Sequence, residues 1–259
     1  MNFKTSLLST AVLAGSLLVT ACGGSSSSNN GSANNNPTGN SDQDYVFTIE
    51  VTNLTYAQPL SPPAIVLHDS SYQLFSEGLE ASIGLEELAE SGSNASLIEE
   101  AQSYDSVIQT IAGGSIILPG SSEEFTLRLD ADLDDDLNGN LDTVLAESEI
   151  SLVTMLVNTN DAFTGEKNID ISAFEINQSK TFNGPVWDSG TEENSETAAS
   201  IPGPAANGEG FNSSRENDVN KVIFHPGVVS RDDGLSSSVL TQAHRFDQPA
   251  SRIRITRIQ

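Results

Sequence analysis

The sequence has too few of several residues to belong to some common protein classes. It contains one cysteine in 259 residues, so no internal disulfide can hold the fold together. Only 11 Lys and Arg residues stand against 36 Asp and Glu residues, which gives a formal net charge of −25. This shortage of positive charge argues against nucleic acid as a partner, because binding phosphates needs a positive surface. Charged residues nevertheless make up only 18% of the chain, so it is not an acidic disordered polymer.

The N-terminal apolar run is too short to span a membrane. Residues 7–19 carry no charge, but 13 residues of helix fall short of the roughly 30 Å of bilayer hydrocarbon. With Lys4 in front of it, this run predicts a signal peptide over residues 1–21. The letters VTAC that end it resemble a bacterial lipobox, in which the cysteine becomes the lipid-modified first residue. An ordinary signal peptide is the alternative, but Cys22, the only cysteine, falls where a lipobox requires it.

A polar segment separates the predicted lipid from the rest of the chain. Residues 22–43 are rich in Ser, Asn and Gly and contain no large apolar side chain, so we predict a disordered tether with an end-to-end distance of about 25 Å. The order of lipid, tether and domain predicts a protein anchored to the bacterial cell envelope, touching the membrane through its lipid only. Gly23 follows the cysteine in place of the Asp linked to inner-membrane retention, which favours the outer membrane over the inner one.

Residues 44–259 are predicted to form one all-β domain. Apolar and polar residues alternate over several short runs, as in half-buried strands. These runs cover residues 45–51, 125–129, 169–173, 219–224 and 253–255. Residues 151–157 (SLVTMLV) are apolar on both faces, which predicts a central strand. Turn-rich segments separate the runs, and residues 192–210 are predicted to be a long surface loop. Short spaced strands of this kind favour an antiparallel sandwich or barrel.

Two short helices are predicted between the early strands. Apolar residues recur at helical spacing over residues 79–89 and 97–111. Gly92 is suited to end the first helix. Ser96 and Glu99 fit a capping box at the start of the second.

The familiar motifs of nucleophilic and zinc catalysis are missing from the sequence. There is no G-x-S-x-G and no H-E-x-x-H. His68, His225 and His244 lie far apart in unrelated contexts, and a structural or surface role is the simpler interpretation of each. A hydrolase that uses paired carboxylates stays open as an alternative in so acidic a chain, although a single Trp offers little aromatic platform for a sugar. We therefore expect the protein not to be an enzyme.

Two acidic regions are candidates for a hard cation such as Ca²⁺, which binds six to eight oxygen ligands. In the first, Asp134, Asp136 and Asn138 match the first half of an EF-hand-like loop. However, Leu145 stands where a bidentate Glu is needed, and an acidic hairpin that turns at Asn138 is the favoured alternative.

The second candidate region is spread along the chain. Asp161 follows a strongly apolar strand, and Asp188 and Glu192 follow another strand-like stretch. Loops at one end of a sandwich can bring such residues together. The alternative is that these residues only cap turns.

Four separated segments resemble the spondin N-terminal domain family. They are MLVNTNDAFTG, WDSGTE, the opening stretch from FTIEVTNLTYAQPLSPPAIVLHD to LFSEGLEASIGLEELAESG, and the tail QPASRIRITRI. The resemblance covers about residues 44–259. It implies a C2-like β-sandwich that binds Ca²⁺ at one end, with the metal positions of the family falling on Asp161, Asp188 and Glu192. Glu192 departs from the family, which has Asp there, and Glu193 or Glu196 are alternative ligands.

The sequence thus leads to one main hypothesis and two rivals. The main hypothesis is a non-enzymatic calcium-binding domain displayed on the envelope for adhesion or ligand recognition, whose partner is an unidentified protein or glycan. The rivals are an envelope hydrolase with a carboxylate or metal site, and a purely structural envelope protein whose acidic residues only keep the surface soluble.

Overall fold

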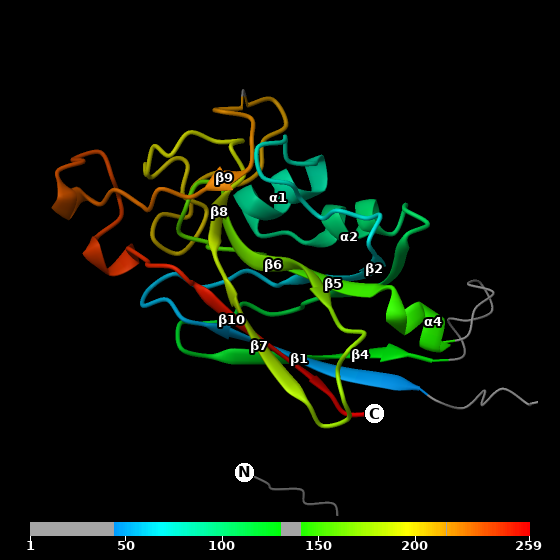
Figure 1. Cartoon of the computed structure of the whole chain (residues 1–259). Helices are drawn as coiled ribbons and strands as arrows, with labels where there is room; N and C mark the ends of the chain where they lie inside the picture. The colour runs from blue at the N-terminus through cyan, green and yellow to red at the C-terminus, as the bar shows by residue number, and fades with distance from the viewer. Residues whose placement is uncertain (1–43, 131–140, 216) are drawn as a thin grey trace, which may run out of the picture. The chain divides into compact units, whose positions relative to one another are not determined.

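The described part of the chain is a two-layered β domain with three short α-helices and two 3-10 helices, η2 (Arg231–Asp233) and η3 (Gln242–His244). The computed structural model describes residues 44–130, 141–215 and 217–259 (Figure 1). Residues Asn40–Gln259 form one compact unit. Across these described segments, no helix is long and apolar enough to cross a membrane.

The strands form two antiparallel sheets, which confirms the predicted all-β sandwich. The first sheet has the order β4-β1-β10-β7 and the second β3-β2-β5-β6-β8-β9. The strands of the first sheet are β4 (Ser122–Leu129), β1 (Tyr45–Asn53), β10 (Ser251–Arg257) and β7 (Ser179–Gly184). Those of the second are β3 (Val107–Ala112), β2 (Ala64–Asp69), β5 (Ser148–Met155), β6 (Ala162–Asp170), β8 (Val186–Asp188) and β9 (Ile223–Phe224).

The main core lies between the two sheets, and a second core lies on the outer face of the second sheet. Alternate residues of β1, including Phe47 and Ile49, pack into the main core, as their alternation with polar residues predicts. The second core is formed where α1 (Ile83–Ser91) and α2 (Ala95–Ala101) cover the sheet (Figure 1). Strand β5 is therefore covered on both faces, which explains why its sequence is apolar without alternation.

The first predicted helix is confirmed, and the second is only partly right. Helix α1 ends at Ser91, and Gly92 after it adopts the left-handed conformation expected of a C-cap. Helix α2 ends at Ala101, and the second half of the remaining stretch predicted as helical, residues 107–111, belongs to β3. β-branched residues dominate β3, and its pairing with β2 overrides the helical spacing. The predicted capping box at Ser96 and Glu99 is wrong, because α2 begins at its N-cap Asn94.

Two further elements differ from the sequence prediction, and one predicted loop is confirmed. Helix α4 (Leu141–Ala146) was not predicted. Of the predicted strand 219–224, only β9 is a strand. The long loop over residues 192–210 is confirmed, since it contains no helix or strand. The candidate loop residues Asp134, Asp136 and Asn138 lie outside the described residues, so that prediction stands as it was.

The loops of the sandwich gather at two opposite ends. The β1–β2, β3–β4 and β5–β6 loops share one end with the segment that follows β8. Strand β1 starts, and β10 finishes, at the other end (Figure 1). Antiparallel pairing places the residues that follow β5 and β8 at the first end, which is where the second acidic region lies.

Candidate functional site

Strand pairing brings Asp161 and Asp188 together. Asp161 is the last residue before β6, and Asp188 is the last residue of β8. These strands pair antiparallel with Ala162 opposite Asp188, and the backbone N–H of Ser189 donates to the carbonyl of Asp161 over 3.2 Å. The two aspartates therefore sit on adjoining strand ends although 27 positions separate them in the sequence.

The carboxylate of Asp161 is satisfied on one oxygen only. Its Oδ2 accepts hydrogen bonds from Ser189 Oγ at 2.9 Å, from the Thr191 N–H at 2.9 Å and from the Glu192 N–H at 3.1 Å. Its Oδ1 is buried and has no hydrogen-bond partner, and the whole residue is 0% exposed. A buried acceptor without a partner is costly, so this oxygen is suited to receive a proton or a cation.

Asp188 is held in a tight turn that requires glycine at position 190. Its Oδ1 accepts from the Gly190 N–H at 2.8 Å, and its Oδ2 accepts from Asn194 Nδ2 at 2.7 Å. Gly190 has φ +73°, and a Cβ there would lie 2.4 Å from the carbonyl oxygen of Lys221. The turn can therefore form only with glycine, which keeps Asp188 and the following residues folded over Asp161.

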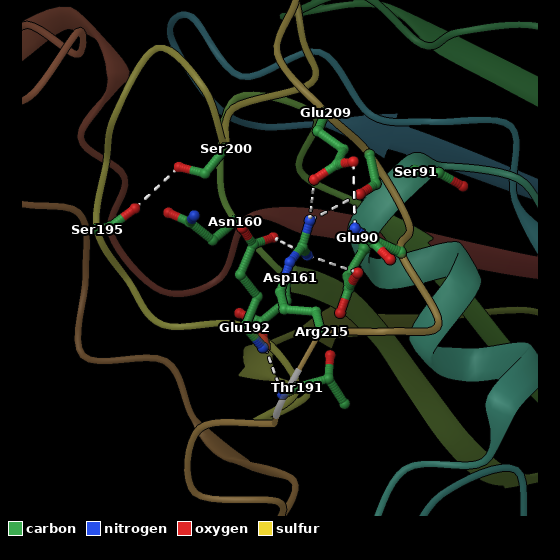
Figure 2. A network of polar contacts seen from close by, with 12 residues as sticks. Glu90, Ser91, Asn160, Asp161, Thr191, Glu192, Ser195, Ser200, Glu209 and Arg215 are labelled. Atoms are coloured by element: carbon green, nitrogen blue, oxygen red, sulfur yellow. Dashed lines mark hydrogen bonds and ion pairs between the residues drawn. The ribbon is translucent and has the colours of Figure 1, made fainter.

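The third predicted ligand, Glu192, joins the other two through its backbone but not through its carboxylate. Its N–H donates to Asp161, whereas its Oε2 lies 2.8 Å from Nη1 of Arg215. The side chain of Glu192 thus points toward the guanidinium in this arrangement (Figure 2).

Arg215 lies at the centre of a carboxylate cluster. Its Nη1 is 2.8 Å from Glu90 Oε2 as well as from Glu192, and its Nη2 is 3.3 Å from Glu209 Oε2 (Figure 2). Nη2 also donates to the carbonyl of Gly210 over 3.0 Å. The side chain of Glu90, on α1, is 0% exposed, so this arginine links a helix, the turn after β8 and a distant loop. Arg215 was not predicted from the sequence, and nothing in its polar surroundings singles it out.

The site is rich in carboxyl groups that are largely buried. Burial, with the charge of Asp188 adding to it, raises the pKa of Asp161, and burial also raises the pKa of Asp188. Burial raises the pKa of Glu192 to about 8, against the opposing influence of Arg215. Burial raises the pKa of Glu90 as well. One guanidinium therefore faces more carboxylates than it can neutralise, and the excess favours uptake of a proton or a cation.

The donor set suits Ca²⁺ in chemistry but is incomplete in geometry. All three predicted ligands offer oxygen, which is what calcium requires, and Asp161 Oδ1 has no other partner. Yet within residues 44–130, 141–215 and 217–259, no three acidic, His or Cys side chains are grouped so as to hold a metal ion. The carboxylate of Glu192 does not complete the set in this arrangement, because its Oε2 is paired with Arg215.

The three histidines have structural surroundings. His68 ring nitrogens lie 2.7 Å from the carbonyl of Asp69 and 2.7 Å from Ser151 Oγ. His225 Nδ1 accepts from a backbone N–H, its Nε2 lies 4.0 Å from Asp188 Oδ2, and burial lowers its pKa to about 4. His244 Nδ1 accepts from the Thr241 N–H. His225 is connected to the acidic site through Asn194, whose Oδ1 lies 3.2 Å from His225 Nε2 and whose Nδ2 donates to Asp188 Oδ2 over 2.7 Å.

Glu196, one of the alternative ligands, should make stability depend on pH. It is 1% exposed, Oε1 accepts from the Val229 N–H at 3.2 Å, Oε2 has no partner, and burial raises its pKa to about 7. An unfolded Glu titrates near pH ~4.3, so the folded protein keeps a proton that the unfolded chain releases. The stability that this proton contributes is complete below pH ~4.3 and is lost as the pH rises to about 7.

We expect Glu196→Gln to stabilise the metal-free domain by about 2 kcal/mol at pH 8 and to have little effect at pH 4, because glutamine carries no charge to bury. Denaturant unfolding at the two pH values measures this difference. The exposed neighbour Glu193 provides the control, since Glu193→Gln should leave the pH profile unchanged. An equal gain at both pH values would mean that packing, and not titration, is responsible.

Comparison with known proteins adds one match. The model of the family described as Spondin_N matches residues 57–227, which is more than half of the chain. The matched stretch includes Asp161, Asp188 and Glu192 together with Arg215. No curated protein matches the sequence.

Proposed function

Because the chain belongs to the Spondin_N family, we propose that it is a non-enzymatic calcium-binding β-sandwich carried on the bacterial cell envelope by a lipid at Cys22. Its role would be adhesion or recognition of a protein or glycan. The outer membrane is the proposed location, because Gly23 follows the lipidated cysteine.

One observation carries the calcium proposal. Asp161 Oδ1 is a fully buried carboxylate oxygen without a partner, and it lies beside the strand end that bears Asp188. Three donors hold the other oxygen of Asp161, so the side chain cannot turn to find a different partner. A divalent cation bound there would remove both the unpaired acceptor and the repulsion between the two carboxylates.

The roles of the individual residues follow from their positions. Asp161 and Asp188 would hold the ion, and Glu192 would complete the set after releasing Arg215. Bound calcium would supply positive charge that ties the β5–β6 loop to the turn after β8. Arg215 would keep Glu90 and Glu209 as partners, so the guanidinium would not be left without a counter-charge.

Calorimetric titration of the compact unit Asn40–Gln259 with calcium chloride tests this proposal. We expect heat of binding with a Kd between micromolar and millimolar, and a weaker response to magnesium, which demands a stricter octahedral geometry. At about 100 times the Kd, calcium should add about 2.7 kcal/mol to the free energy of unfolding. The absence of both heat and any gain in melting temperature at millimolar calcium would refute the proposal.

A further inference from the structure

One end of the sandwich exposes apolar side chains that the candidate site does not use. Tyr56 is 82% exposed and Leu118 is 60% exposed, and Leu54 and Ile116 are about half exposed. All four lie in the β1–β2 and β3–β4 loops, which we call the apolar tip. These loops run close together at the end of the sandwich that also carries the acidic site (Figure 1).

The apolar tip is free of charge in a chain that is otherwise strongly acidic. Residues 54–63 (LTYAQPLSPP) and 113–121 (GGSIILPGS) contain no Asp, Glu, Lys, Arg or His. Charged residues make up 18% of the whole sequence, and the net charge is −25. A surface that stays in water gains nothing from lacking charge, whereas a surface that enters an apolar medium avoids a large desolvation cost.

The two loops are braced so that these side chains stay outside the core. Leu60 and Ile117 exchange backbone hydrogen bonds of 3.0 and 2.9 Å, and Ile117 is buried. The buried Asn53 donates through Nδ2 to the carbonyls of Gln58 at 2.8 Å and Ile117 at 2.9 Å. Because Ile117 points inward, Ile116 and Leu118 on either side of it are held outward.

We propose that the apolar tip inserts into the interface of a lipid bilayer, as a second membrane contact in addition to the lipid at Cys22. Tyr favours the headgroup level, and Leu and Ile favour the acyl boundary. Four side chains are far fewer than the roughly 20–30 residues that each partner contributes to a stable protein complex, so a protein or a second copy fits this surface less well.

The predicted tether permits this contact. Strand β1 is nine residues long, so its start lies about 30 Å from the apolar tip. Residues 22–43 can extend to about 70 Å, which is enough for the domain to turn its tip toward the membrane that holds the lipid. That the tip meets the same membrane as the lipid rests on the proposed anchor at Cys22, whereas the insertion of the tip into a bilayer does not. Insertion would place the acidic site close to the membrane surface.

Flotation of the compact unit Asn40–Gln259 with phosphatidylcholine vesicles tests the proposal without the anchor. We expect measurable partitioning of the wild type into the vesicle fraction. In Tyr56→Ser/Leu118→Ser it should fall at least about tenfold, because two apolar side chains that enter the membrane are lost. Adding anionic phosphatidylglycerol should weaken binding at low salt, since the acidic domain is repelled.

Two controls make the outcome specific. Ile83 and Ile176 are 66% and 56% exposed and lie outside the apolar tip, so Ile83→Ser/Ile176→Ser should bind vesicles like the wild type. Tyr56→Trp should show a blue-shifted emission with vesicles and quenching by brominated lipid. The proposal is overturned if the wild type does not float, if the control loses binding equally, or if the tip variant loses only self-association. Full-length Cys22→Ser tests the lipid anchor separately.

Discussion

Asp161→Asn should abolish calcium binding and, at the same time, raise the melting temperature of the metal-free domain. The asparagine oxygen can accept the same three hydrogen bonds that now reach Asp161 Oδ2. The buried charge disappears, and with it the repulsion that, together with burial, raises the pKa of Asp161. Near neutral pH, the variant no longer has to bury a carboxylate without a counter-charge.

The two effects differ in size and are measured separately. Loss of a supporting residue around a metal typically costs 10–100-fold in affinity, so loss of a direct ligand should weaken calcium binding by more than about a hundredfold. Removing the buried charge should stabilise the metal-free domain by about 1–3 kcal/mol, which corresponds to roughly 2–12 °C in Tm for a domain of this size. Calorimetry measures the first effect, and thermal unfolding with a chelator present measures the second.

Glu175 is a suitable control because it is exposed and lies away from the site. Glu175→Gln changes the net charge by the same amount, so it should alter neither calcium binding nor stability by more than about 0.5 kcal/mol. If Asp161→Asn still binds calcium like the wild type, the ion does not use this carboxylate. If the variant is instead strongly destabilised without metal, the hydrogen bonds to Asp161 matter more than its charge.

Arg215→Gln should destabilise the metal-free domain by about 3 kcal/mol and increase the stabilisation that calcium provides. Removing the guanidinium leaves Glu90 and Glu192, both almost fully buried, without their ion-pair partner. Loss of one member of a buried ion pair typically costs 3–5 kcal/mol, which partial exposure of the arginine reduces. Glu192 then becomes available to the ion at no cost, so calcium should bind more tightly than in the wild type.

Unfolding curves with calcium and with a chelator measure both parts of this prediction. Arg245 is the matched control, because its pair with Asp233 lies on the surface at 3.0 Å, and its loss should have little effect on stability in either condition. A weaker calcium affinity in Arg215→Gln would show that the arginine positions Glu192 for the metal and does not compete with it.

The alternation of apolar and polar residues predicted the strands well where one face is buried and the other faces solvent. In β1 and β10, apolar residues alternate with polar ones because only one face packs into the core. The error at residues 97–111 has a different origin. Leu97 and Ala101 belong to α2, whereas Val107 and Ile111 belong to β3, yet together they fit a helical period. Only the pairing with β2 shows that the second pair belongs to a strand and not to the helix, and β2 lies some 40 residues earlier in the chain.

The acidic site was only partly predictable, because it too depends on contacts between residues far apart in the chain. Strand-like runs placed Asp161 and Asp188 at strand ends, and the resemblance to a known family grouped them with Glu192. The interaction with Arg215 could not be foreseen, because Glu90 and Arg215 are 125 positions apart and neither belongs to a recognisable motif. Whether Glu192 faces the aspartates or the arginine depends on that distant contact.

The sequence by itself determined the composition of the chain, the run of half-buried strands and the uncharged character of the two tip loops, because each depends on neighbouring residues alone. Tertiary structure decided which strands pair, which loops meet at one end, and that Tyr56 and Leu118 stay exposed while Asp161 is buried. These features depend on contacts between residues far apart in the chain, and burial sets their energy, so no local pattern encodes them.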